Sequence, residues 1–298
     1  MKRKTTLAII MILIAASGWG IIGVFSRPMA AVGLNVVQVT FVRSLVVLAG
    51  MTVLLLIKDK ALPRVRLKDM WIFLGTGLVS IVFFNVCYFL TIERTTLAAA
   101  SILLYTAPCF VMLMSALFFK EKITLQKVAA LVLAFVGCTL ASGFAGGDIG
   151  LGALLTGIGA GLGYASYSIF GKVALKKYQT FTVIFYTFLV ATICLFPFAG
   201  IPAIASVLAA RPEGIAPALG LGLVSTFMPY VFYTYGLKYV EAGKASVLAF
   251  AEPMVAAVAG IVIFNEPLHT KNVLGILLIF AAIVLLNIPI GKGAGEHE

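Results

Sequence analysis

Charged residues are scarce in this chain of 298 residues. Asp, Glu, Lys and Arg together make up 11% of it, whereas a soluble domain normally carries about 25%. So few charges could not cover the surface of a soluble protein, and the hydrophobic residues, 62% of the chain, gather in continuous runs. The composition therefore excludes a soluble fold and predicts an integral membrane protein.

Residues that bind metals or perform covalent catalysis are also few. The four cysteines occur singly inside apolar runs, and the two histidines lie in a predicted loop and in the C-terminal tail. This pattern predicts no metal site and no disulfide framework, and nothing in it requires a cofactor. The sequence contains neither a Walker A motif nor a Ser–His–Asp set, so we expect neither ATP hydrolysis nor an enzyme.

Ten apolar runs are long enough to cross a bilayer as helices. A spanning helix needs about 20 mostly apolar residues, and a continuous run of that length satisfies its backbone hydrogen bonds only as a helix. The predicted spans, joined by short connecting segments, are 6–26, 34–57, 70–92, 96–119, 125–143, 150–171, 179–200, 215–237, 243–264 and 271–290. We therefore expect an all-α fold of ten transmembrane helices.

The positions of Lys and Arg predict how the chain is threaded. With the N-terminus placed inside, 17 of the 22 basic residues fall at the inner ends of the spans and four at the outer ends. Basic residues concentrate on the cytoplasmic side of multi-pass proteins. We predict a plasma-membrane protein with both termini in the cytoplasm. The net charge of +11 then reflects topology, and we expect the bilayer, not nucleic acid, as its partner.

The chain repeats itself at a spacing of 145 residues. Sliding the sequence by that distance pairs glycine, serine, proline and acidic positions: 77–80 with 222–225, Pro108 with Pro253, and Glu121 with Glu266. We predict two five-helix repeats, residues 1–145 and 146–298. Because five is odd, the second repeat is threaded in the opposite sense. Inverted repeats are typical of transporters, with the substrate site near the midplane, and they provide alternating access.

Two segments that coincide in this repeat resemble a known family. SILLYTAPCFVMLMSALFFKEKIT and SVLAFAEPMVAAVAGIVIFNEPL are similar to the paired signature of EamA-type carriers of the drug/metabolite transporter superfamily. The segment FVRSLVVL, which contains Arg43, also resembles that family's pattern. The resemblance implies a ten-helix inverted repeat that moves amino acids, metabolites or drugs, often outward. It also suggests a scaffold role for Arg43.

Two charged side chains lie deep within predicted spans. Arg43 in span two and Glu252 in span nine are each about 12–14 Å inside a hydrocarbon core about 30 Å thick. An ion at that depth must face protein, water or a partner. One interpretation is that Arg43 holds a substrate carboxylate while Glu252 binds an amine or carries a proton. The alternative is a structural role, either as an Arg43–Glu252 pair or through separate backbone partners.

Two prolines interrupt predicted spans at equivalent positions, Pro108 in span four and Pro253 in span nine. Proline removes a backbone donor and bends a helix, and bent helices often line transporter sites, although the bend could also serve packing alone. Ser101 and Tyr105 share a helical face with Pro108, and Ser246 shares one with Pro253. We predict that both faces line the transport path.

Three further equivalent pairs carry aromatic or amide groups: Trp19 with Tyr164, Asn85 with Tyr230, and Tyr88 with Tyr233. An Asn at lipid depth must find a hydrogen bond, and a Tyr can stack on an apolar substrate and offer its hydroxyl. Aromatic residues also form interfacial belts, but these positions lie inside the spans. We predict that these six side chains bind the substrate together with Ser101, Tyr105, Ser246 and Glu252.

These observations predict a secondary transporter, an exporter or exchanger, of small metabolites such as amino acids. A membrane enzyme acting on lipid-linked substrates would need a polar catalytic cluster at one interface, which the sequence lacks. A non-transporting partner subunit would usually add a soluble domain or a long tail. Both remain the alternatives, and we expect a monomer or a homodimer.

Overall fold

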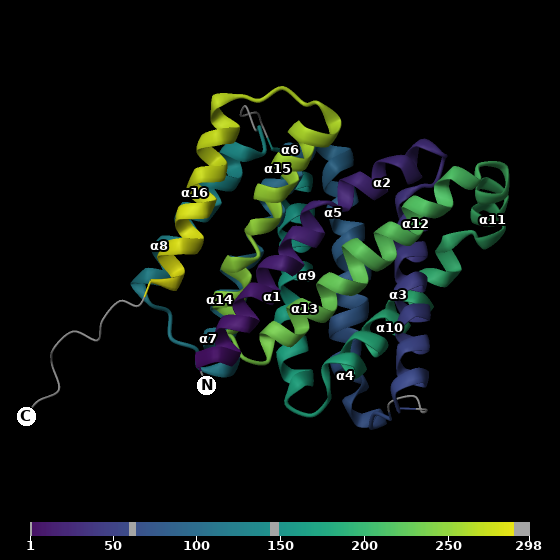
Figure 1. Cartoon of the computed structure of the whole chain (residues 1–298), viewed down its shortest axis with the longest axis horizontal. Helices are drawn as coiled ribbons and strands as arrows, with labels where there is room; N and C mark the ends of the chain where they lie inside the picture. Colours follow the sequence, from purple (N-terminus) through teal and green to yellow (C-terminus); the bar gives the residue numbers. More distant parts are fainter. Residues whose placement is uncertain (1, 60–63, 144–148, 289–298) are drawn as a thin grey trace, which may run out of the picture.

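The structure is a computed structural model that describes residues 2–59, 64–143 and 149–288 (Figure 1). Within these ranges every regular element is a helix. The described chain contains nine helical segments long and apolar enough to cross a membrane: Arg3–Ala31, Val36–Ile57, Leu67–Arg94, Leu97–Phe119, Leu151–Leu175, Thr180–Ala199, Pro212–Leu237, Ala242–Phe264 and Thr270–Asn287. The chain is therefore a multi-pass α-helical membrane protein, as its composition predicts.

The fifth predicted span, 125–143, is shorter in the structure. Helix α8, Leu125–Ala141, has 17 residues and is apolar. Its start is capped by Thr124, whose side chain accepts a hydrogen bond from the backbone of Lys127. The predicted boundary between the repeats at residues 145 and 146, and two of the counted basic residues, Lys60 and Lys292, lie outside the described residues.

Helix α8 packs along α16, Thr270–Asn287, at one edge of the molecule (Figure 1). Gln126 at the start of α8 donates hydrogen bonds to the carbonyls of Leu285 (2.7 Å) and Ile288 (2.9 Å) near the end of α16. At the other end of the pair, Asn272 donates to the carbonyl of Ala141 at 2.9 Å. The two helices therefore run antiparallel, and they are the segments that the 145-residue offset superposes.

Several spans consist of two helices separated by a break. These are α1 (Lys2–Gly20) with α2 (Ile22–Ala31), α6 (Leu97–Leu104) with α7 (Ala107–Phe119), and α14 (Ala242–Leu248) with α15 (Ala251–Phe264). Pro108 and Pro253 lie in the first turns of α7 and α15, where a missing backbone N–H leaves no intrahelical bond unmade. In these two spans the break therefore falls just before the proline.

Spans three and eight are irregular at matching heights. Span three runs through α4 (Met70–Phe73), a π-helical segment (Leu74–Phe83) and α5 (Phe84–Arg94); span eight runs through α12 (Ile215–Gly222), a π-helical segment (Leu223–Phe227) and α13 (Met228–Leu237). The uninterrupted long helices are α3 (Val36–Asp59), α9 (Leu151–Leu175), α10 (Thr180–Ala199) and α16. Wide helical turns of this kind are frequent at functional sites.

Contacts between the halves are reciprocal. The ring of Phe170 lies directly against Gly75, and the ring of Phe25 lies directly against Gly220. These contacts exchange under the 145-residue offset, since Gly75 corresponds to Gly220 and Phe25 to Phe170. A two-fold relation between two units produces such a pattern. Glycine is needed at both positions because any side chain there would collide with the ring.

One connecting segment is more ordered than the sequence predicts. Between spans seven and eight the chain forms helix α11, Ile201–Ala210, which begins after Gly200 in a left-handed conformation (φ +61°). Pro202 in its first turn and the alanine-rich run that follows favour a short helix.

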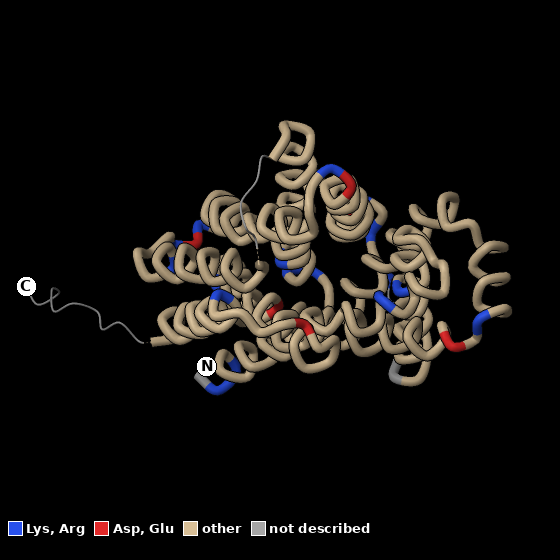
Figure 2. Tube along the Cα trace, turned by 90° about the horizontal axis from the view of Figure 1, so that it is seen from above, with Lys and Arg blue, Asp and Glu red and all other residues tan. Residues whose placement is uncertain are grey.

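Charged residues are few along the whole described trace, and most of its length is uncharged (Figure 2).

Candidate functional site

A small cavity lies where helices of the two halves meet. Its walls are formed by aromatic and hydroxyl side chains from α1, α9, α13 and the π-helical segment of span three: Trp19, Ser80, Tyr164, Tyr167, Ser168, Tyr230 and Tyr233. The space is about 20 Å³, which holds about one water molecule. A larger ligand must therefore move the rings apart, and the described conformation is a contracted one.

Trp19 is the central ring of this cluster. It lies near the end of α1, just before the break at Ile21, and it is buried. Its ring centroid is 5.1 Å from that of Tyr233, 5.5 Å from that of Tyr230 and 6.4 Å from that of Tyr164. Tilted and edge-on contacts at these distances are favourable between aromatic rings. Four predicted site residues from three helices therefore form one aromatic group.

Hydrogen bonds fix two of the tyrosines and leave a third available. The hydroxyls of Tyr167 and Thr234 are 2.5 Å apart, and those of Ser168 and Tyr233 are 2.8 Å apart. The hydroxyl of Tyr230 has no hydrogen-bond partner among the residues that the structure describes, although the ring packs 4.8 Å from that of Tyr167. Tyr230 can therefore offer its hydroxyl to a ligand without losing an existing bond.

Glu252 adjoins this aromatic group through Tyr164. The Tyr164 hydroxyl donates a hydrogen bond to Oε2 of Glu252 at 2.9 Å. Glu252 lies in the first turn of α15, where the helix dipole stabilises a carboxylate. In the described ranges no Lys or Arg forms an ion pair with it. This carboxylate at lipid depth is thus held by a hydroxyl and not by a counterion.

Arg43 lies on α3 and has no ionic partner either. Its Nε is buried without a hydrogen bond, and within the described part of the chain no carboxylate pairs with its guanidinium. The Arg43–Glu252 ion pair, one of the structural alternatives, is therefore not formed. Both groups interact electrostatically with the hydroxyl of Tyr230. Burying a charge without a partner is costly, which makes Arg43 a candidate to bind an anionic group.

Tyr88, Ser101 and Tyr105 form a second group beside the cavity. The hydroxyls of Tyr88 and Ser101 are 3.2 Å apart, and the ring of Tyr105 lies 5.8 Å from that of Phe250. Phe84 connects this group to the cavity, with ring centroids 6.0 Å from Tyr88 and 5.5 Å from Tyr164. The Tyr105–Phe250 contact joins the breaks of spans four and nine.

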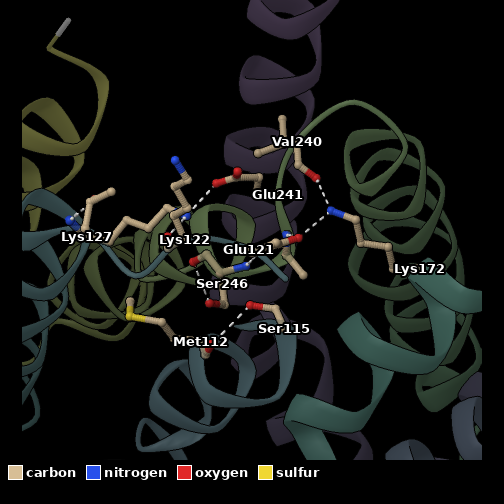
Figure 3. A network of polar contacts seen from close by, with 12 residues as sticks. Met112, Ser115, Glu121, Lys122, Lys127, Lys172, Val240, Glu241 and Ser246 are labelled. Carbon is tan, nitrogen blue, oxygen red and sulfur yellow. Dashed lines mark hydrogen bonds and ion pairs between the residues drawn. The ribbon is translucent and has the colours of Figure 1, made fainter. Parts of the chain in front are cut away.

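Two predicted site residues lie away from the cavity lining. Asn85 donates to the carbonyl of Ile81, one turn earlier in span three, at 2.6 Å, so its amide is satisfied locally. Ser246 is buried and donates to the carbonyl of Gly243 at 2.9 Å. It lies close to the end of the molecule that carries Lys122, Lys127 and Lys172, which we call the lysine-rich end (Figure 3). Neither side chain lines the aromatic cavity in this conformation.

Sequence reasoning missed three residues that line the cavity: Ser80, Tyr167 and Ser168. Tyr167 and Ser168 follow Tyr164 by three and four positions, so helical spacing alone places them on the same face. Ser80 belongs to the repeated segment 77–80. Tyr167 and Ser168 could have been found by extending the face of Tyr164, and Ser80 by following the repeated segment.

The fold defines a multi-pass α-helical membrane protein with a small aromatic cavity where its halves meet. The chain belongs to the EamA-like transporter family, whose model matches it twice in tandem, over residues 6–143 and 151–288. The chain is thus a membrane transporter, a class that works on small-molecule substrates in a lipid bilayer.

Similar proteins agree with this assignment. Two relatives are proteins of Archaeoglobus fulgidus named uncharacterized transporters. The first is 31% identical over 66% of this chain and 70% of its own length. The second is 30% identical over 75% of this chain and 79% of its own length. The uncharacterized inner membrane transporter YicL of Salmonella typhimurium is 22% identical over 96% of each chain. One crystal structure shares the fold with a TM-score of 0.77 at 16% identity, covering 96% of this chain and 97% of the other.

Proposed function

We propose that the chain is a secondary transporter, an exporter or exchanger, of small amphipathic metabolites such as amino acids. The observation that carries this proposal is the aromatic cavity, whose Tyr164 donates a hydrogen bond to the carboxylate of Glu252, a group without a counterion in the described chain. A guanidinium suits a substrate carboxylate, and a carboxylate suits an ammonium group. The rings of the cavity suit an apolar side chain. The absence of ATP-binding motifs in the sequence favours transport driven by gradients.

We further propose ten spans arranged as two inverted repeats, residues 1–145 and 146–298, in the plasma membrane with cytoplasmic termini. Helix α8 serves as the fifth span. The antiparallel packing of α8 and α16, the reciprocal contacts between the halves and the tandem family match support this arrangement. The lysine-rich end of the molecule then faces the cytoplasm.

The topology has a direct test in two equivalent positions, Leu125 and Thr270, which begin α8 and α16 and are both exposed. Single cysteines are introduced at each in a background that lacks the four native cysteines, and intact cells are treated with a membrane-impermeant thiol reagent. We expect Thr270→Cys to react from outside and Leu125→Cys to react only after permeabilisation. Labelling of both from the same side would contradict an inverted repeat.

A network at the lysine-rich end joins the two halves (Figure 3). Glu121, between α7 and α8, accepts hydrogen bonds from Nζ of Lys172 (2.7 Å) and from the backbone N–H groups of Ala242 (2.9 Å) and Gly243 (3.1 Å). Its side chain is only 7% exposed. Burial raises the pKa of Glu121, but the lysine and the two N–H donors outweigh it, so the net pKa is lowered. We name these four residues the Glu121 latch.

The equivalent pair at the opposite end is much looser. Glu266 pairs with Arg27 at 2.8 Å, but these side chains are 48% and 53% exposed. The N-terminus of α6, which corresponds to the residues that Glu121 holds, is capped by its own Thr96 through the N–H of Ala99. The conformation is therefore held closed at the lysine-rich end. In our proposal, transport alternates between this state and one in which the latch opens.

Counterflow in liposomes tests the cavity. Purified protein is reconstituted without ATP and loaded with a panel of aromatic and aliphatic amino acids. We expect Tyr230→Ala to weaken the apparent affinity roughly 10- to 100-fold, since a buried aromatic surface and a free hydroxyl are both lost. Tyr230→Phe, which keeps the ring, should lose less.

The control is Phe280→Ala, which removes a lipid-exposed ring from α16 and should leave transport unchanged. Unchanged affinity in both Tyr230 variants would refute the cavity assignment. Chemical conversion of a substrate instead of its movement would favour a membrane enzyme.

A further inference from the structure

A second cavity lies at the lysine-rich end, apart from the aromatic one. Its volume is about 450 Å³, and it is lined by Arg64, Val65, Arg66, Asp69, Lys177 and Tyr178. These residues come from the start of span three and from the link between α9 and α10. None of them belongs to the proposed transport path or to the Glu121 latch.

The single carboxylate of this cavity is already neutralised. Asp69 is buried and accepts from Nζ of Lys177 at 2.5 Å and from the hydroxyl of Tyr178 at 2.7 Å. The Tyr178 hydroxyl in turn accepts from the backbone N–H of Arg66 at 3.2 Å. Asp69 therefore holds the wall of the cavity together, and its charge is balanced by Lys177.

Two guanidinium groups remain without partners. Arg64 and Arg66 are exposed, and neither forms an ion pair with any carboxylate in residues 2–59, 64–143 and 149–288. With Asp69 and Lys177 cancelling each other, the lining carries two net positive charges. A guanidinium matches the geometry of a phosphate group through paired N–H donors. The cavity thus has the charge and the donors for a phosphate.

Exposed apolar side chains follow directly after the arginines of this cavity along the chain. Span three begins directly after Arg66, and its outward-facing Leu67 and Trp71 are 86% and 53% exposed. Tryptophan is enriched where a membrane protein meets the headgroup region. The basic cavity therefore lies at the depth of lipid headgroups, next to a surface that acyl chains can cover.

We propose that this cavity binds the phosphate group of an anionic phospholipid, with Arg64 and Arg66 as the phosphate ligands and the acyl chains along Leu67 and Trp71. The lysine-rich ends of membrane proteins face the leaflet that contains anionic lipids, which agrees with this position. A free phosphate ion has no apolar part that could cover the exposed side chains of Leu67 and Trp71. The lipid site is separate from the substrate cavity.

Thermal unfolding of the full-length protein in vesicles tests the proposal. The probes are phosphatidylglycerol mixed into phosphatidylcholine vesicles, phosphatidylcholine alone, and phosphatidylcholine with millimolar inorganic phosphate. We expect phosphatidylglycerol to raise the melting temperature of the wild type. The double variant Arg64→Gln/Arg66→Gln should bind phosphatidylglycerol on the order of 30-fold more weakly. Its melting temperature in vesicles with phosphatidylglycerol should therefore equal that of the wild type in phosphatidylcholine alone.

The matched control removes the same charge from the same end of the molecule. Arg3→Gln/Lys4→Gln changes two exposed residues of α1 and should keep the phosphatidylglycerol response. An equal loss of the stabilisation by phosphatidylglycerol in this control would show that the lipid acts by diffuse electrostatic attraction and not at this cavity, which would overturn the proposal. Stabilisation by inorganic phosphate in phosphatidylcholine would identify a free phosphate as the ligand and overturn the lipid assignment.

Discussion

If the carrier is coupled to protons, replacing Glu252 with glutamine is expected to abolish the stimulation of transport by a pH gradient while the protein remains folded. Of the 11 acidic residues, Glu252 alone lies well inside a predicted span. It is the carboxylate that adjoins the cavity, and no counterion in the described chain keeps it charged. A proton that crosses with or against the substrate therefore has one carboxyl group at this depth to occupy. Uptake into liposomes with and without an imposed gradient measures the effect.

The matched variant for this experiment is Tyr164→Phe. It removes the hydroxyl that donates to Glu252 at 2.9 Å but keeps the carboxylate and the ring contact with Trp19. Stimulation should persist with a shifted pH dependence, because the environment of the carboxylate changes. Size-exclusion chromatography in detergent controls for folding. If Glu252→Gln retained full stimulation, Glu252 would have no part in coupling.

The second large effect is expected from Glu121→Gln, which should open the lysine-rich end of the protein. The amide loses the ionic attraction to Lys172 and weakens the bonds to the N–H groups of Ala242 and Gly243. A cysteine at Ser246, which is buried behind the latch, reports the opening in a background without native cysteines. We expect its labelling from the lysine-rich side to become at least about tenfold faster.

Glu266→Gln is the symmetry-matched control for the latch. Its pair with Arg27 is half exposed, and exposed pairs contribute little to stability, so labelling at Ser246→Cys should not change.

The latch should also respond to pH. Because the pKa of Glu121 is lowered, its carboxylate stays ionised, and the latch stays intact, until the pH falls through that lowered value. Labelling should accelerate only below it. Equal labelling rates at Ser246→Cys in the Glu121→Gln and Glu266→Gln variants would mean that Glu121 does not hold this end closed.

The charged positions of the site are the ones where the repeat is broken. Under the 145-residue offset Arg43 corresponds to Phe188, and Glu252 corresponds to Ala107. Phe188 packs its ring 4.9 Å from that of Tyr230, the residue with which Arg43 interacts electrostatically. The duplication therefore supplies the scaffold of the cavity, while its two charged groups come from residues that only one half carries.

Much of the fold follows from one-dimensional features of the sequence. Apolar run length predicted nine spans that the structure contains as long helices, and it placed α8 correctly although that helix ends earlier than predicted. Helix α11 was not predicted, since its only buried residue is Ile204 and it shows no spanning run. Paired residues at a constant offset, such as Pro108 and Pro253, located equivalent breaks before any contact was known.

The sequence by itself determined the class of protein, the approximate spans and which segments correspond, because run length and offset can be counted along one chain. Only the tertiary structure decided that Trp19 meets three tyrosines, that Glu252 bonds to Tyr164 and not to Arg43, and that Asn85 and Ser246 lie elsewhere. These outcomes depend on how each helix is rotated and where it crosses its neighbours. That geometry is set by packing between residues that are far apart in sequence, as the contacts of Gly75 and Gly220 illustrate.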